Sequence, residues 1–162
     1  MMKKTWIEIL KLTISIIICE SAGVIGSIFT TPAIPGWYAA LVKPSFTLPN
    51  WVFAPVWTSL YLLMGISVFL VWRKGLDNHL VNSALRLFIV QLVLNTFWSI
   101  LFFGLRSPLL GLVEIIILWV AILLTILSFF RVSKIAGILL LPYILWVSFA
   151  AILNFSLWRL NL

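Results

Sequence analysis

Residues 109–130 read LLGLVEIIILWVAILLTILSFF, an apolar run interrupted by a single charged side chain, Glu114. A helix needs about 20 apolar residues to cross the hydrocarbon core of a bilayer, and this run is long enough. Lipid offers backbone N–H and C=O groups no hydrogen-bond partners, so a spanning segment of this kind must be helical. The run therefore predicts a transmembrane helix.

Three similar runs precede it and one follows, at residues 7–31, 51–72, 84–105 and 135–158. The 162-residue chain is 64% hydrophobic and 9% charged, a composition that excludes a water-soluble globule and a disordered chain. The runs are continuous rather than alternating, which argues against a β-barrel. We predict an all-α membrane protein, a bundle of five transmembrane helices that forms one domain over residues 1–162.

The distribution of basic residues predicts the orientation of the bundle. With five spans, the N-terminus and the second and fourth connections share one side of the membrane. That side holds most of the 11 Lys and Arg residues, namely Lys3, Lys4, Lys11, Arg73, Lys74, Arg86, Arg131 and Lys134, and the other side holds Lys43, Arg106 and Arg159. The positive-inside rule then places the N-terminus inside and the C-terminus outside. We read the net charge of +7 as this topology signal and expect no nucleic-acid partner.

The first run is expected to be a retained helix, because its apolar character continues well beyond Cys19. The connection that follows, residues 32–50, is long and contains Pro32, Pro35, Pro44 and Pro49. Such proline density predicts a stiff, extended and ordered loop over the outer end of the bundle. At the end of this loop, Asn50 is expected to cap the next helix.

Polar and aromatic residues share faces of the expected helices, at spacings of three and four. One face carries Gln91, Asn95, Trp98 and Phe102, and another carries Tyr143, Trp146, Ala150 and Asn154. In the first helix, Gly23 and Ser27 permit close helix approach. Together with Trp51 and Glu114, these faces predict a lidded apolar pocket in the outer half of the bundle, suited to a flat aromatic ligand.

Each of these residues also has a simpler reading. Trp residues anchor helices at membrane interfaces, and amides hold helices together. Glu114 either pairs with Lys43 or Arg106 or contacts a ligand. Glu20, an acid within the first span, is either functional or a neutral, hydrogen-bonded structural group.

Signatures of ordinary enzyme chemistry are missing from the sequence. The chain has one Cys and one His, too few for a disulfide framework or an ordinary zinc or iron–sulfur site. It contains no phosphate-binding loop and no dinucleotide-binding glycine motif. We predict no metal site and no obligatory cofactor.

Several separate motifs resemble the translocator protein family, whose members are also called tryptophan-rich sensory proteins (TspO/MBR) or peripheral-type benzodiazepine receptors. They are WYAALVKPSF (37–46), PNWVFAPVW (49–57), LYLLMG (60–65), QLVLN (91–95) with Trp98, FFG (102–104), LPY (141–143) with Trp146, LN (153–154) and WR (158–159). These motifs are spread over nearly the whole chain, which resembles a bacterial member of the family.

The resemblance implies a five-helix bundle, often a homodimer, that binds tetrapyrroles such as protoporphyrin IX and synthetic benzodiazepine- or isoquinoline-type ligands. It also implies, position by position, a pocket lined by Ser27, Thr30, Trp51, Phe53, Ala54, Asn95, Trp98, Leu110, Ile117, Trp146, Ala150 and Leu153. Leu110 stands where animal members carry an aromatic residue, so a roomier pocket is expected. Phe155 and Ser156 depart from the animal cholesterol motif before Arg159, which counts against sterol binding by that motif.

Three functions remain open at this point. The first is a receptor or transporter-like protein for porphyrins in the membrane. The second is light-dependent breakdown of a bound porphyrin, with Trp51 and Trp146 as the catalytic residues. The third is a small ion-coupled exporter in which Glu20 carries the proton. The basic N-terminus favours a bacterial plasma membrane as the location.

Overall fold

The computed structural model describes residues 2–162, with side chains from Thr5 onward, so Lys3 and Lys4 lie outside the described side chains. The described residues form helices and no strands, which confirms the all-α prediction. In chain order the elements are α1 (Met2–Ala33), the π-helix η1 (Ile34–Tyr38), α2 (Asn50–Trp72), α3 (His79–Ser99), the π-helix η2 (Ile100–Gly104), α4 (Pro108–Val132), α5 (Lys134–Leu139) and α6 (Leu141–Leu160).

Five helical segments within residues 5–160 are long and apolar enough to cross a membrane, as predicted. They are Thr5–Tyr38, Asn50–Trp72, His79–Gly104, Pro108–Val132 and Lys134–Leu160. The predicted bounds are too short at several ends, because polar residues that hydropathy does not register still belong to the helices or cap them. The side chain of Asn78, for example, accepts a hydrogen bond from the Leu80 amide at 2.9 Å and starts α3 at His79.

The last span is interrupted rather than continuous. Pro142 has no N–H to donate to the carbonyl four residues earlier, which weakens the helix at this point. The chain makes a turn at Leu140, and α5 and α6 are separate helices on its two sides.

The connection between the first two spans differs from the predicted extended loop. Helical structure continues through η1 to Ala40, so the non-helical part is confined to residues 41–49. Pro35 lies in the first turn of η1, where a missing N–H costs little, and the wider π turn accommodates it. The capping prediction for Asn50 is also wrong, because Pro49 occupies the cap position and no side chain caps the first amides of α2.

Residues 41–49 are fastened to the far end of the chain. The Val42 amide donates to Oδ1 of Asn161 at 2.9 Å, and Nδ2 of Asn161 donates back to the Val42 carbonyl, also at 2.9 Å. Nζ of Lys43 donates to the carbonyls of Ala39 and Leu41 at 3.0 and 3.1 Å. The segment therefore has a defined path across the end of the bundle.

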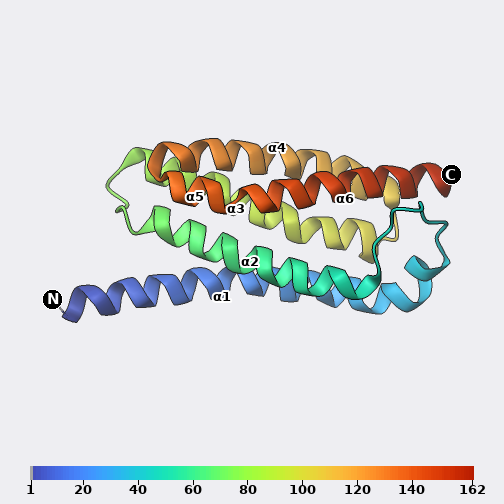
Figure 1. Ribbon diagram of the computed structural model, residues 1–162, viewed down its shortest axis with the longest axis horizontal. Helices are drawn as coiled ribbons and strands as arrows, with labels where there is room; N and C mark the ends of the chain where they lie inside the picture. The colour runs from blue at the N-terminus through green and yellow to red at the C-terminus, as the bar shows by residue number, and fades with distance from the viewer. Residues whose placement is uncertain (1) are drawn as a thin grey trace.

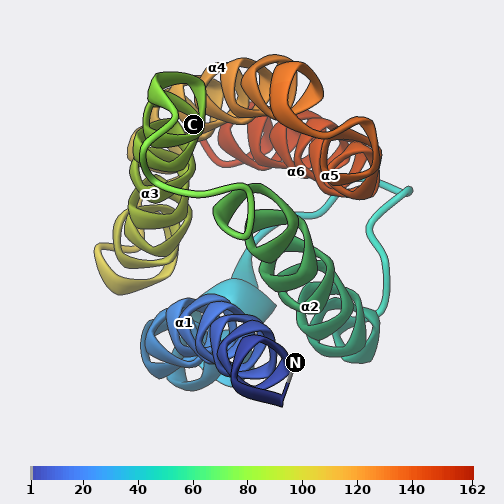
Figure 2. The ribbon, with the colours of Figure 1, turned by 90° about the vertical axis from the view of Figure 1, so that its left-hand side faces the viewer.

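The helices form one elongated bundle. The N-terminus and the α2–α3 and α4–α5 connections lie at one end, whereas residues 41–49, the η2–α4 connection and the C-terminus lie at the other (Figure 1). Viewed along the bundle, α1 and α4 lie on opposite sides (Figure 2), with α1 packed on α2 and α3 and α4 packed on α3 and α6. We call the end that holds the C-terminus the loop end.

Small residues set the spacing of α1 from its neighbours, as predicted for Gly23, whereas Ser27 is exposed and lines the cavity. A Cβ added to Gly65 of α2 would lie 2.8 Å from Cα of Ile16, so the two backbones touch at this point. A Cβ on Gly23 would lie 2.5 Å from the ring of Tyr61, and one on Gly26 would lie 2.9 Å from Oγ of Ser99. Close approach of helix backbones through small residues is typical of membrane bundles.

Candidate ligand-binding site

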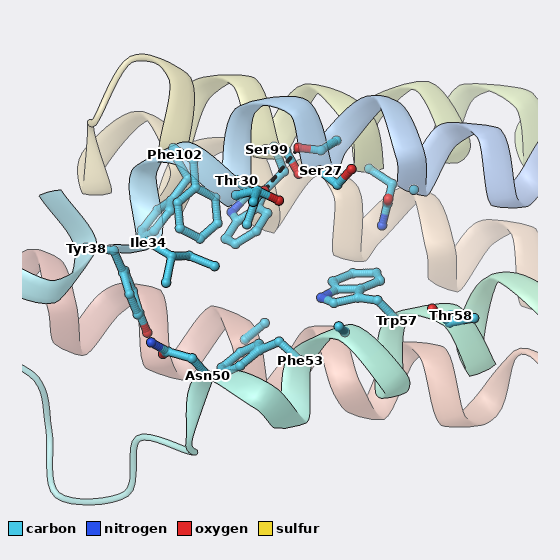
Figure 3. Close-up of a pocket in the computed structure, with 18 of the residues that line it drawn as sticks. Ser27, Thr30, Ile34, Tyr38, Asn50, Phe53, Trp57, Thr58, Ser99 and Phe102 are labelled. Carbon is cyan, nitrogen blue, oxygen red and sulfur yellow. Dashed lines mark hydrogen bonds between the residues drawn. The ribbon is translucent and has the colours of Figure 1, made fainter. Parts of the chain in front are cut away.

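A cavity of about 360 Å³ lies between the helices in the half of the bundle nearer the loop end. Figure 3 shows side chains from α1, η1, α2, α3 and η2 converging on it. Its lining comprises Glu20, Gly23, Val24, Gly26, Ser27, Thr30 and Thr31 of α1, Ile34 and Tyr38 of η1, Asn50, Phe53, Ala54, Trp57, Thr58 and Tyr61 of α2, Asn95, Trp98 and Ser99 of α3, Phe102 and Phe103 of η2, and Trp146, Ala150, Leu153, Asn154 and Leu157 of α6.

Most of the pocket residues that the family resemblance implies lie on this wall. They are Ser27, Thr30, Phe53, Ala54, Asn95, Trp98, Trp146, Ala150 and Leu153. Three do not, namely Trp51, Leu110 and Ile117, whose side chains are 74%, 44% and 53% exposed on the surface of the bundle. Their contact with a ligand stays a prediction that this cavity does not support.

The helical period explains where these three residues point. The α2 residues on the wall, from Asn50 to Tyr61, follow spacings of three and four, so Trp51 lies about 100° around the helix from Asn50 and faces outward. On α4 the buried face contains Gly111, and Leu110 and Ile117 lie on the opposite, exposed face. The two indoles expected to act together on an excited porphyrin, Trp51 and Trp146, are therefore not brought to the same wall.

Two buried amides join the helices around the cavity. Tyr61 donates its hydroxyl proton to Oδ1 of Asn95, and Nδ2 of Asn95 donates to the hydroxyl of Tyr143 at 2.9 Å. Asn95 thus connects α3 with α2 and α6. The side chain of Asn95 therefore joins three helices and also forms part of the cavity wall.

The second amide, Asn154, is placed in the same way. Nε1 of Trp98 donates to its Oδ1 at 3.2 Å, and its Nδ2 donates to the Pro108 carbonyl at 2.7 Å. A Cβ on Gly111 would come within 3.0 Å of Oδ1 of Asn154, so a glycine is needed beside it. The amide ties α6 to α3 and to the first turn of α4, which fixes the indole of Trp98 on the wall.

Several buried polar atoms have no hydrogen-bond partner in the described part of the chain. They are both amide atoms of Gln91, both carboxylate oxygens of Glu114, Nε1 of Trp146 and Oε2 of Glu8, of which the last forms an ion pair with Arg73. The predicted pairing of Glu114 with Lys43 or Arg106 is wrong, because both of its oxygens are buried and unpartnered. Among the residues that carry these groups, Trp146 also lines the cavity, but its Nε1 is itself buried and only other atoms of the side chain face the open space.

Aromatic rings form much of the wall. Trp98 stacks on Phe102 with ring centroids 5.0 Å apart, and Phe53 meets Trp146 edge to face at 5.8 Å. Trp57 stacks on Tyr61 at 5.6 Å. Such surfaces favour a flat, aromatic ligand over a flexible aliphatic one.

The cavity opens sideways between α1 and α2. Val24 and Thr31 of α1, and Ala54 and Thr58 of α2, line it and are at the same time exposed on the bundle. Both helices are membrane-spanning segments, so this opening faces the lipid. The sequence did not predict this lateral opening, and the predicted lid stays a prediction because no residue of 41–49 lines the cavity.

Sequence reasoning did not single out every wall residue as a ligand contact. Trp57 and Thr58 could have been found by extending the period of α2 from Phe53 and Ala54. Tyr38 lies in the π-helix η1, whose widened geometry shifts side chains off the α-helical period, whereas Phe102 of η2 is on the wall as its spacing from Trp98 predicts.

Comparison with known proteins identifies the family of the chain. The model of the TspO/MBR family matches residues 15–159. The chain belongs to the TspO/MBR family. This confirms the resemblance found in the motifs, and with the five apolar helices it supports an integral membrane protein of the receptor or sensory kind.

Relatives within the TspO/MBR family come from widely separated organisms. The chain is 48% identical to the tryptophan-rich protein TspO of Chlorobaculum tepidum, over 95% of this chain and 98% of that protein. It is also 48% identical to the tryptophan-rich protein TspO of Archaeoglobus fulgidus, over 95% and 99%. The human translocator protein is 40% identical over 77% of this chain and 75% of its own length.

Proposed function

We propose that this protein is a membrane receptor for porphyrins, represented by protoporphyrin IX, and that benzodiazepine- and isoquinoline-type compounds compete for the same cavity. The observation that carries the proposal is a cavity whose walls are largely aromatic, with Trp98 stacked on Phe102 and Phe53 packed edge to face on Trp146. A planar ring stacks on such walls.

The size of the cavity agrees with this proposal. Its volume of about 360 Å³ lies in the range of small-molecule sites. The opening between α1 and α2 lets the edge of a larger ring extend toward the lipid. A ligand of this kind enters from the bilayer, in which porphyrins dissolve.

The proposal is tested by titrating protoporphyrin IX into the purified protein and following tryptophan fluorescence. We expect saturable quenching, and we expect Trp146→Ala to weaken the affinity about tenfold through loss of ring contact. Trp6→Ala is the matched control, because the Trp6 indole is 68% exposed and lies at the other end of α1. Equal affinity in the wild type, Trp146→Ala and Trp6→Ala proteins would remove the cavity as the site.

We further propose that the protein lies in a bacterial plasma membrane with its N-terminus inside, and that it forms homodimers as the family resemblance implies. The excess of basic residues at the N-terminal end of the bundle supports the orientation. Cross-linking in native membranes tests the dimer: a single monomeric band at every cross-linker concentration would contradict it.

A further inference from the structure

The cavity contains one carboxyl group, at the end away from residues 41–49. Glu20 is the first residue of α1 on the wall, and the contact of Gly23 with Tyr61 places it beside the last wall residue of α2. Among the described residues of the lining, Glu20 is the one acid, and Lys, Arg and His are absent. The wall is therefore apolar and aromatic, with a single site of negative charge.

Two aromatic rings, Tyr61 and Trp57, line the same part of the cavity as this acid. The ring of Tyr61 touches Gly23, which is one turn along α1 from Glu20, and Trp57 stacks on Tyr61 with an interplanar angle of 29°. Figure 3 shows the indole of Trp57 extending from α2 into the cavity toward α1. The inner end of the cavity thus combines a carboxyl group with an indole and a phenol.

Glu20 differs from the other acids of the spanning segments. Glu8 forms an ion pair with Nε of Arg73 at 2.9 Å, and Glu114 is sealed in the interior, off the cavity wall. In the described part of the chain, no hydrogen bond or ion pair involves Glu20. An acid at this depth of the bilayer is costly unless a partner compensates it, and the cavity is where a partner can reach it.

We propose that the inner end of the cavity binds the protonated nitrogen of a lipophilic aromatic amine. Glu20 pairs with the ammonium, and the indole of Trp57, backed by Tyr61, adds cation–π attraction, which is strongest where water is excluded. The aromatic part of the amine lies against Phe53 and Trp146 farther along the cavity. This inference rests on the cavity itself and not on porphyrin binding.

The test compares two probes of the same shape, naphthalene carrying a dimethylaminomethyl group and its carbon analogue isobutylnaphthalene. Binding to the purified full chain in lipid nanodiscs is followed by equilibrium dialysis of each probe. Partition into protein-free nanodiscs is measured for each probe and subtracted. We expect the wild-type protein to bind the amine about tenfold more tightly than the carbon analogue.

Variants assign the preference to particular side chains. Glu20→Gln keeps the size of the side chain and is expected to bring the affinity ratio of the two probes close to one, with the carbon analogue unaffected. Trp57→Leu is expected to reduce the ratio about threefold. The controls are Glu8→Gln, which removes an acid of the same helix outside the cavity, and Trp6→Leu, which removes an exposed indole.

Two outcomes overturn the inference. One is equal affinity of the wild-type protein for both probes after the correction for partition. The other is a loss in Glu20→Gln that affects both probes by the same factor, since this marks a purely structural residue. Titration of the wild-type samples with protoporphyrin IX separates the two proposals. If the wild-type protein binds no porphyrin but still binds the amine more tightly than its carbon analogue, only the porphyrin-receptor proposal is contradicted.

Discussion

At the scale of single residues, Gly65 is the one glycine of the described chain whose added Cβ would meet backbone atoms of another helix. A Cβ at this position would meet backbone and side-chain atoms of Ile16 at 2.8 to 3.2 Å. Backbone atoms cannot move aside as a flexible side chain can, so the whole of α1 would have to shift. The absence of a side chain at Gly65 therefore sets the distance between α1 and α2.

Gly65→Ala is accordingly expected to lower the free energy of unfolding by about 1–3 kcal/mol, the usual cost of overpacking. Denaturant unfolding in mixed micelles, followed by circular dichroism, measures this change. Gly36→Ala is the matched control, because nothing lies within 4 Å of a Cβ added there. Equal stability of the two variants would show that α1 and α2 are not in contact at Gly65.

The burial of single residues could be predicted from the sequence where the helical period places them on one face. The faces that contain Asn95 and Asn154 are buried, as the spacings of three and four indicate. The helical period of α2 alone would have predicted that Trp51 faces outward. We instead predicted that Trp51 lines the cavity, because of the family motif and the neighbouring loop. The burial of Glu114 without a partner could not be predicted, since it depends on packing between helices that the local sequence does not encode.

At the scale of elements, the spanning segments could be predicted because hydropathy over about 20 residues decides them. The first connection could not. Proline content suggests an extended path, yet η1 is helical, and its ring contacts with η2 help to hold it: Trp37 meets Phe102 edge to face at 5.4 Å. The attachment of Val42 to Asn161 joins residues 119 apart in the sequence and leaves no local pattern.

This attachment predicts the behaviour of residues 41–49. Asn161→Ala removes both hydrogen bonds to Val42, and we expect hydrogen exchange at the Val42 amide to become about fivefold faster, the equivalent of one ordinary hydrogen bond. Exchange is measured by mass spectrometry of peptides from this segment. Ser156→Ala is the control, because Oγ of Ser156 donates only within its own helix, to the Ile152 carbonyl. Unchanged exchange in Asn161→Ala would mean that other contacts hold the segment.

At the scale of the whole molecule, an odd number of spans separates the two chain ends. The N-terminus and the α2–α3 connection share one end of the bundle, and residues 41–49 lie at the other (Figure 1). The basic residues of the described chain follow this division: Arg73 and Lys74 lie at the first end and Lys43 at the second. The structure shows which segments share an end of the bundle, and the excess of Lys and Arg predicts which end lies inside.

Cysteine labelling tests this direction. In a Cys19→Ser background, Ser45→Cys and Asp77→Cys each place one exposed thiol at opposite ends of the bundle. A membrane-impermeant maleimide applied to intact cells should label Ser45→Cys and spare Asp77→Cys, and both should react after lysis. The reverse pattern would invert the orientation.

The gap between α1 and α2 has a consequence for how affinity is measured. A compound that arrives through this gap comes from the hydrocarbon phase, where its concentration follows its partition coefficient rather than its total amount in the sample. Apparent dissociation constants will then rise as more lipid or detergent is added at fixed protein. Expressed as mole fractions in the membrane, the same constants should stay unchanged.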